Sequence, residues 1–192
     1  MTFKEIKRKI KSKCVGIAGA GGLGSNCAVA LARVGVGKII IADFDKITKE
    51  NLNRQYFFID QIGQKKVFAL SDNIDFINPE VTIVTNDVIL DPGKILEIYK
   101  ECDVIIEAFD DAAMKQMIIE TVQSHWPEKP LIIGSGMAGW GDNSSIKCRK
   151  IDNLYICGDE KSEISDEMPP LAPRVGIVAH LQANIALEIL LT

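Results

Sequence analysis

An α/β fold is predicted by this sequence: a Rossmann-like, doubly wound and mostly parallel sheet, with an antiparallel C-terminal extension and a final helix. Three observations predict it. Short apolar runs alternate with segments of helical period, the first apolar run ends in a glycine loop, and polar residues follow several of the runs. Strands and helices that alternate with short connections favour a parallel sheet covered on both faces. Ligands of such sheets bind beyond the carboxyl ends of the strands, where we expect those polar residues to meet.

Six segments have the composition of strands. Five short apolar runs are typical of buried parallel strands and cover residues 14–21, 38–45, 81–85, 103–109 and 130–139. A sixth segment, 144–151, alternates polar and apolar residues, which is typical of an edge or antiparallel strand. The sheet is therefore expected to change character after its fifth strand.

Helices are predicted between these strands from amphipathic periodicity and from proline and glycine stop signals. They cover residues 25–34, 61–77, 93–100, 111–126 and 174–191. The polar and acidic segment 158–168 and the prolines after it predict a mobile crossover loop over 158–172, ahead of the last helix.

The N-terminal segment 1–13 is basic, and its apolar residues Phe3, Ile6 and Ile10 fall at helical spacing. This spacing predicts a short amphipathic helix. A basic arm that reaches a partner or an anion is the alternative. We find no apolar core region or cleavage site of a signal peptide after it.

Composition bounds the class of protein. The 192 residues predict a single domain, 1–192, and the 47% hydrophobic and 25% charged content is typical of a soluble protein. The net charge of -4 argues against a general nucleic-acid binder, and the absence of a run of 18 apolar residues argues against a membrane span. Five cysteines without a C-x-x-C pair predict reduced thiols in a cytoplasmic protein and no structural zinc.

The glycine loop "GAGGLGS" matches G-x-G-x-x-G at Gly19, Gly21 and Gly24. It follows a predicted strand and opens a predicted helix, which is the context in which this motif binds nucleotides. Asp43 ends the next strand, about twenty residues further on, the usual place of a carboxylate that holds a ribose. These features predict a bound nucleotide, and a glycine-rich turn without a ligand is the alternative.

A second motif adds phosphate-binding chemistry. Arg54 and Gln55 lie in "ENLNRQ", and Lys66 follows in "IGQKK". A guanidinium grips phosphate oxygens with two parallel hydrogen bonds and an ammonium adds a compact charge, so this pair suits a triphosphate better than hydride transfer. Taken singly, Lys66 could be a solvated surface lysine and Arg54 a member of a surface ion pair.

The third motif is "DVIIEAFDD". Asp110 follows the end of a predicted strand, where a carboxylate can hold Mg²⁺. Its alternative role is a helix cap, because aspartate favours that position. Asp111 could be the cap instead, which would leave Asp110 free.

The motifs "GAGGLGS", "IIIADFD", "NLNRQ", "IGQKK", "INP" and "FDD" occur in the order and spacing of the ubiquitin-activating-enzyme-like superfamily. The sequence most resembles its small bacterial branch, the ThiF and MoeB adenylyltransferases, and its ending resembles a compact ThiF-type protein. The resemblance covers about residues 14–191. It implies ATP-dependent adenylylation of the C-terminal carboxylate of a ThiS-like sulfur carrier in thiamine biosynthesis, with a MoaD carrier in molybdopterin synthesis as the alternative.

The resemblance also implies roles for single residues. Gly21 and Gly22 would lie against the ATP phosphates. The residues implied around the ribose, the phosphates and the magnesium ion are Asp43, Asp45, Asn51, Arg54, Gln55, Lys66 and Asp110. Among them Arg54 and Lys66 would neutralise charge during catalysis, Gln55 would support the phosphate contacts, and Asp110 would bind Mg²⁺. Asp111 stands where the family often has asparagine.

Three departures from the family pattern bear on function. Larger relatives carry two C-x-x-C pairs for zinc, and a cysteine in the crossover loop for covalent chemistry; here the loop has none, and Cys157 is the nearest. The N-terminal arginine pattern that reaches a partner subunit is missing as well, with Arg8 as a substitute candidate. A homodimer is still implied by the resemblance.

Two readings from other classes compete with the adenylyltransferase. A nicotinamide-dependent oxidoreductase would need a proton donor at the hydride site, and His125 and His180 are the only histidines. A nucleotide-binding module without catalysis would use the same groove to dock a peptide tail.

Overall fold

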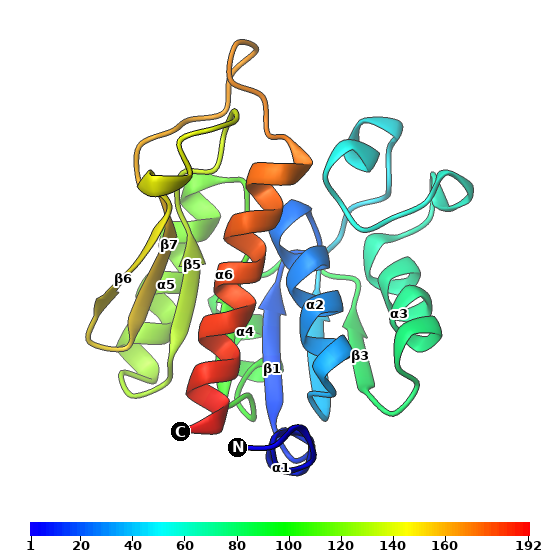
Figure 1. The fold of residues 1–192 in the computed structure, drawn as a ribbon, viewed down its shortest axis with the longest axis vertical. Coiled ribbons are helices and arrows are strands. Elements are labelled where there is room, and N and C mark those ends of the chain that lie inside the picture. Colours follow the sequence, from blue (N-terminus) through cyan, green and yellow to red (C-terminus); the bar gives the residue numbers. More distant parts are fainter.

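The computed structural model describes residues 1–192 and contains one seven-stranded sheet in the order β3-β2-β1-β4-β5-β7-β6 (Figure 1). The strands are β1 (Cys14–Ala18), β2 (Lys38–Ala42), β3 (Thr82–Asn86), β4 (Val104–Glu107), β5 (Leu131–Gly134), β6 (Lys147–Ile151) and β7 (Leu154–Gly158). All neighbouring strands are parallel except β6 and β7, which form an antiparallel hairpin at one edge. The predicted Rossmann-like α/β fold is confirmed.

Five helices cover the two faces of the sheet: α2 (Gly22–Val34), α3 (Lys66–Ile77), α4 (Pro92–Ile98), α5 (Ala112–His125) and α6 (Ala172–Leu191). The first helix, α1 (Phe3–Ile10), lies below the sheet, near the end of α6 (Figure 1). Figure 1 shows α2, α3 and α6 on the near face and α4 and α5 on the far face. Each face has its own apolar core, because side chains of a strand alternate between faces: Ile17 and Ile41 pack toward α2 and α6, and Ile40 and Ile105 toward α4 and α5.

The final helix α6 is long and apolar enough, by length and composition alone, to cross a membrane. In this fold it packs against α2 and strands β4, β5 and β7. Its buried side chains are Arg174, Val175, Val178, Ala179, Gln182, Ala183, Ala186 and Leu190. Its apolar composition is therefore explained by burial inside the α/β fold.

Two helix starts differ by three residues or more from the sequence prediction. The helix predicted from residue 61 begins at Lys66, because Gly63 has a φ of 89°, a left-handed conformation that interrupts a right-handed helix. The helix predicted from residue 25 begins at Gly22, so the end of the glycine loop itself forms the first helical turn.

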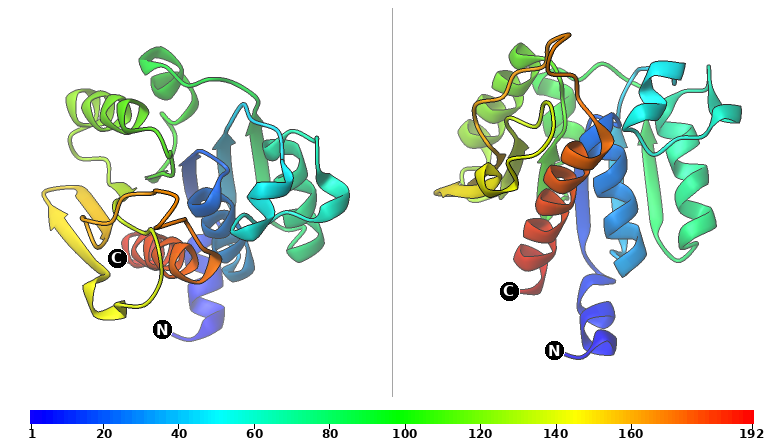
Figure 2. Two further views of the ribbon diagram at one scale, coloured as in Figure 1. Left: turned by 90° about the horizontal axis from the view of Figure 1, so that it is seen from above. Right: turned by 45° about the horizontal axis from the view of Figure 1, so that its top comes forward.

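Strand β7 was not predicted at all. It follows β6 after a tight turn at Asp152 and Asn153, with Asp152 at a φ of 51°. The hairpin carries the chain back so that β7, and not β6, pairs with β5. From there the crossover loop climbs above the carboxyl ends of the strands before it enters α6 (Figure 2).

Candidate active site

A cavity of about 1170 Å³ opens at the carboxyl ends of the parallel strands. It lies around the junction of β1 and β4, where the strand order reverses and where α/β sheets bind ligands. Its wall is built from the glycine loop, the segments after β2, β4 and β5, the start of α3 and α5, and the crossover loop. The volume exceeds the ~300–1,000 Å³ of most small-molecule pockets, which leaves room for a nucleotide and a peptide end together.

The glycine loop approaches the sheet so closely that side chains are excluded. Gly19 has a φ of 102°, and a Cβ there would lie 2.8 Å from the Ala108 carbonyl oxygen. A Cβ at Gly24 would lie 1.8 Å from the carbonyl oxygen of Gly19. Gly21 caps α2 without a side-chain hydrogen bond, and Gly21 and Gly22 both line the cavity. The first amides of α2 therefore face a space suited to an anion.

Asp43 braces this loop from the end of β2. One carboxylate oxygen accepts the Ala20 amide at 2.6 Å and the other accepts the Asp45 amide at 2.7 Å. Burial raises the pKa of Asp43, and the charge of Lys66 partly opposes that rise. Asp43 lines the cavity, so its carboxylate both shapes the loop and faces the bound ligand.

Lys66 is the first residue of α3, and its ammonium is paired with Asp45 at 2.7 Å. The lysine side chain is only 7% exposed, whereas Asp45 is 48% exposed. A cation at a helix N-terminus opposes the helix dipole, so helix stability does not explain its place there. Both residues line the cavity.

Arg54 reaches the cavity from the irregular segment after a 3₁₀ turn. Its guanidinium donates to the Asn53 side chain at 2.8 Å and to the Glu50 carbonyl at 3.5 Å, and forms no ion pair. Beside it, Gln55 is buried with its side-chain oxygen lacking a hydrogen-bond partner. Two polar side chains at this wall thus have capacity left for a ligand.

Asn51 does not line the cavity. Its side-chain oxygen accepts the Thr48 amide at 3.1 Å, which caps the 3₁₀ turn that precedes Arg54. Gly24 also lies outside the lining, because its role is the close approach to Gly19. Direct phosphate contact by Asn51 stays a prediction.

The two aspartates after β4 differ in their contacts. Asp111 caps α5 by accepting the Met114 amide at 2.8 Å. Asp110 is exposed, lines the cavity and makes no hydrogen bond or ion pair within the protein. Mg²⁺ is usually held by one or two carboxylates together with substrate phosphates, so the donor chemistry of Asp110 fits this ion.

Glu107 and Lys115 form a polar cluster that sequence reasoning missed. Glu107, the last residue of β4, is fully buried, and Lys115 in α5 pairs with it at 2.5 Å. The same ammonium donates to the Gly134 carbonyl at 2.8 Å, and Lys115 lines the cavity. Burial raises the pKa of Glu107, and Lys115 opposes that rise. No spacing signal in the sequence pairs these residues, because they meet only once α5 folds back on β4 and β5.

The cysteines and histidines lie away from the chemistry. Cys157 is fully buried, and burial raises its pKa, which disfavours the thiolate that a nucleophile needs. All five cysteines are free thiols, and none lines the cavity. His125 and His180 each contact a backbone carbonyl of their own helix and are absent from the cavity wall.

The ThiF family matches this chain over residues 2–192. Adenylyltransferase and sulfurtransferase MOCS3 of Caenorhabditis briggsae is 32% identical over 191 residues, which cover 95% of this chain and 47% of that protein. Molybdopterin-synthase adenylyltransferase of Escherichia coli K12 is 28% identical over 186 residues, or 94% and 74%. Ubiquitin-like modifier-activating enzyme 5 of Aedes aegypti is 46% identical over 79 residues, or 41% and 20%. The chain thus spans about half of the MOCS3 relative and most of the bacterial one.

Solved structures share the fold. Escherichia coli tRNA N6-threonylcarbamoyladenosine dehydratase in complex with ATP has a TM-score of 0.88 at 19% identity, with 98% of this chain and 89% of that chain covered. Escherichia coli MccB with ATP has a TM-score of 0.73 at 21% identity, with 96% and 58% covered. The ThiF family model matches almost the whole length, so the chain belongs to the ThiF family.

Proposed function

We propose that this protein is an adenylyltransferase that joins the C-terminal carboxylate of a small sulfur-carrier protein of the ThiS type to the AMP part of ATP and releases pyrophosphate. One observation carries the proposal. A single cavity at the switch point contains a buried lysine whose acidic partner is half exposed, an arginine without an ion pair and an aspartate without a partner. The named relatives that match most of the chain are themselves adenylyltransferases.

The chemistry requires charge control more than acid–base catalysis. The attacking carboxylate is already an anion, so the barrier comes from repulsion between it and the triphosphate and from charge that builds on the leaving pyrophosphate. Arg54 and Lys66 would oppose both effects, because preorganised cations in a cavity stabilise developing charge without reorganisation. The amides at Gly21 and Gly22 would add fixed donors for phosphate oxygens.

The remaining residues would orient the nucleotide. Asp43 would accept hydrogen bonds from the ribose, beside Asp45. Gln55, buried beside Arg54, would support the phosphate contacts by donating from its side-chain NH₂ group. Asp110 would hold Mg²⁺, which supplies additional positive charge between the phosphates when bound.

The identity of the carrier protein is a separate part of the proposal. The ThiS reading rests on the resemblance of the sequence to ThiF-type proteins and on its membership of the ThiF family. A MoaD-type carrier in molybdopterin synthesis is the second candidate, favoured by the names of the relatives MOCS3 and molybdopterin-synthase adenylyltransferase. A homodimer in the cytoplasm is part of the same proposal.

Mass spectrometry of ThiS and of MoaD, each incubated with this protein and Mg-ATP, tests the proposal. We expect one carrier to gain the mass of an adenylate, and the same carrier to support exchange of labelled pyrophosphate into ATP. If the protein binds ATP but supports pyrophosphate exchange with neither carrier, adenylylation is refuted. The protein would then be a nucleotide-binding module without catalysis. Tight binding of NADH with no binding of ATP would favour the oxidoreductase instead.

A further inference from the structure

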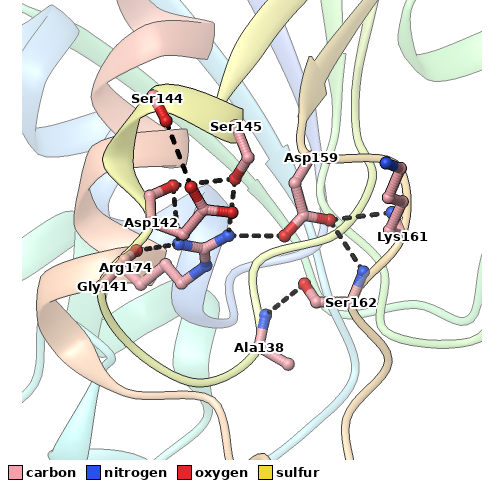
Figure 3. Close-up of polar contacts among 9 residues, drawn as sticks. All are labelled: Ala138, Gly141, Asp142, Ser144, Ser145, Asp159, Lys161, Ser162 and Arg174. Carbon is pink, nitrogen blue, oxygen red and sulfur yellow. Dashed lines mark hydrogen bonds and ion pairs between the residues drawn. The ribbon is translucent and has the colours of Figure 1, made fainter.

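The crossover loop, residues 158–172, is held at its two ends by one buried ion pair. Asp159 stands just after β7 and Arg174 lies in the first turn of α6. Their side chains meet at 2.5 Å and each is 6% exposed (Figure 3). The start of the loop is therefore joined directly to the helix that follows it, although fourteen residues separate Asp159 and Arg174 along the chain.

Asp159 is also the hub of hydrogen bonds at the start of the loop. One of its oxygens accepts the amides of Lys161 at 2.8 Å and Ser162 at 2.7 Å. Burial raises the pKa of Asp159, but the hydrogen bonds from Ser162, Lys161 and Arg174 outweigh it and hold the pKa well below the usual range. The Ser162 hydroxyl then accepts the Ala138 amide at 3.1 Å, which ties the loop to the segment after β5.

Arg174 fixes the other end through the loop before β6. Figure 3 shows its guanidinium between Asp159 on one side and Gly141, Asp142 and Ser145 on the other. It donates to the Gly141 carbonyl and to the Ser145 hydroxyl at 3.2 Å. A Cβ at Gly136 would lie 2.0 Å from the Asp159 carboxylate, so the segment after β5 is packed directly against the ion pair.

The loop tip, residues 163–168, contrasts with this anchored base. Its hydrogen bonds join only Ser165 and Met168 to each other. Glu163 and Ile164 of the tip line the nucleotide cavity, and Ile164 is 56% exposed. A second cavity of about 470 Å³ lies against the pair itself, with Trp140 and Met168 in its wall. Beyond these bonds, Met168 packs against Gly139, and the Gly139 amide donates to the Pro169 carbonyl at 2.9 Å just after the tip. The position of the tip therefore depends on the base of the loop and on the segment after β5.

We propose that the Asp159–Arg174 pair is a positioning pair that keeps the loop tip at the rim of the nucleotide cavity, where the tip binds the carrier protein. The inference rests on the proposed function, because it assigns the carrier as the molecule that the tip meets. The pair itself does not touch the nucleotide. Its loss lowers the fraction of molecules with the tip in place, and the apparent affinity for the carrier falls by the same fraction.

Asp159→Asn is the decisive variant, because it keeps the shape of the side chain and removes its charge. We expect faster hydrogen exchange at the amides of Lys161 and Ser162. We also expect a Kd and KM for ThiS about tenfold higher, with kcat at saturating carrier and the Kd for ATP within about twofold of wild type. Arg149→Ala is the matched control, because it breaks the neighbouring pair with Glu160, which also spans 2.5 Å but is 51% and 37% exposed. We expect all five quantities to stay near wild type in this control.

Unchanged exchange in Asp159→Asn, or faster exchange with an unchanged Kd for ThiS, overturns the inference. A fall in kcat without a change in KM overturns it too. If Asp159→Asn does not fold, Ser145→Ala removes one acceptor of Arg174 and is expected to change the same quantities in the same direction by about two- to threefold. If the wild type binds ThiS without pyrophosphate exchange, the proposed function fails while the Kd still decides the role of the pair. If it binds neither ThiS nor MoaD, both fail.

Discussion

Two lysines line the cavity from opposite sides of the switch point, and each forms an ion pair with an acidic residue. In one pair the lysine is the more buried partner, and in the other the acidic residue is. Lys66 is 7% exposed and its partner Asp45 is 48% exposed. Lys115 is 24% exposed and its partner Glu107 is fully buried. The two distances are similar, at 2.7 Å and 2.5 Å, so geometry alone does not distinguish the pairs.

The difference in burial separates their roles. In the proposed function, Asp45 would turn into water at small cost when a phosphate takes its place beside Lys66, because exposed ion pairs contribute little. Lys115 cannot leave Glu107 in the same way, because an uncompensated carboxylate would then stay inside the protein. The β2 side of the cavity therefore offers a cation to a ligand, and the β4 side uses its cation to hold the fold together.

Lys115→Met is expected to give the largest effect on stability. Breaking a buried pair by removal of one partner costs about 3–5 kcal/mol in the free energy of unfolding. Thermal unfolding beside the wild type measures this loss. A change in stability below about 1 kcal/mol would place Lys115 among weak surface pairs and remove the contrast with Lys66.

The pH dependence of Lys115→Met sharpens the same test. Burial raises the pKa of Glu107 in the folded state, and loss of Lys115 raises it further. A folded acid with a raised pKa binds more protons than the unfolded chain, so stability falls as pH rises from its unfolded pKa through its folded pKa. The deficit of the variant should therefore shrink as pH is lowered from 7 toward the unfolded pKa of about 4.3. A deficit that is independent of pH would contradict the assignment to Glu107.

Lys66→Ala is expected to be the largest effect on activity. Loss of one preorganised donor costs on the order of 10²–10³ in rate, or about 2.7–4 kcal/mol in the barrier. Pyrophosphate exchange measures it, with a thermal melt to show that the fold is retained. Full pyrophosphate exchange in this variant would show that Lys66 does not stabilise charge in the reaction.

Asp45→Asn should have a much smaller effect than either lysine variant. Its carboxylate is nearly half exposed, so the pair contributes at most about 1 kcal/mol to stability after solvent screening. Removal of a competing anion beside Lys66 should leave the Kd for ATP unchanged or lower it, as calorimetry would show. A large loss of stability would mean that the Asp45–Lys66 pair stabilises the fold as the Glu107–Lys115 pair does.

Gly176→Ala in α6 is the smallest change. No atom lies within 4 Å of a Cβ built there, so alanine adds helix propensity without a clash. We expect a gain of about 0.5–1 kcal/mol in the free energy of unfolding and no change in pyrophosphate exchange. Loss of stability would show that the added methyl group does not fit the space around Gly176.

Much of this molecule was predictable because its signals are local. The glycine loop and the buried parallel strands are set by residues close in sequence, and the structure places Gly21, Asp43, Arg54, Lys66 and Asp110 around one cavity. The Asp111 cap of α5 also follows from a local preference of aspartate.

The features that were not predicted depend on contacts between residues that are distant in the sequence. Strand β7 follows a turn at Asp152 and Asn153, residue types that favour turns without specifying a hairpin, and its pairing with β5 is a contact between distant residues. The Asp159–Arg174 pair has no such signal, because it forms only when the loop closes between β7 and α6. In the sequence, Lys115 looks like an ordinary polar residue of an amphipathic helix. Only the structure shows that it pairs with the buried Glu107.

Both chain ends emerge beneath the sheet, on the side opposite the crossover loop (Figure 1). The ammonium of Lys9 in α1 even donates to the carbonyl of Leu191 at the end of α6. An affinity handle or a dye attached at either end would therefore project away from the nucleotide cavity. The protein can be tethered to a sensor surface by that base and still present its open rim to an incoming carrier.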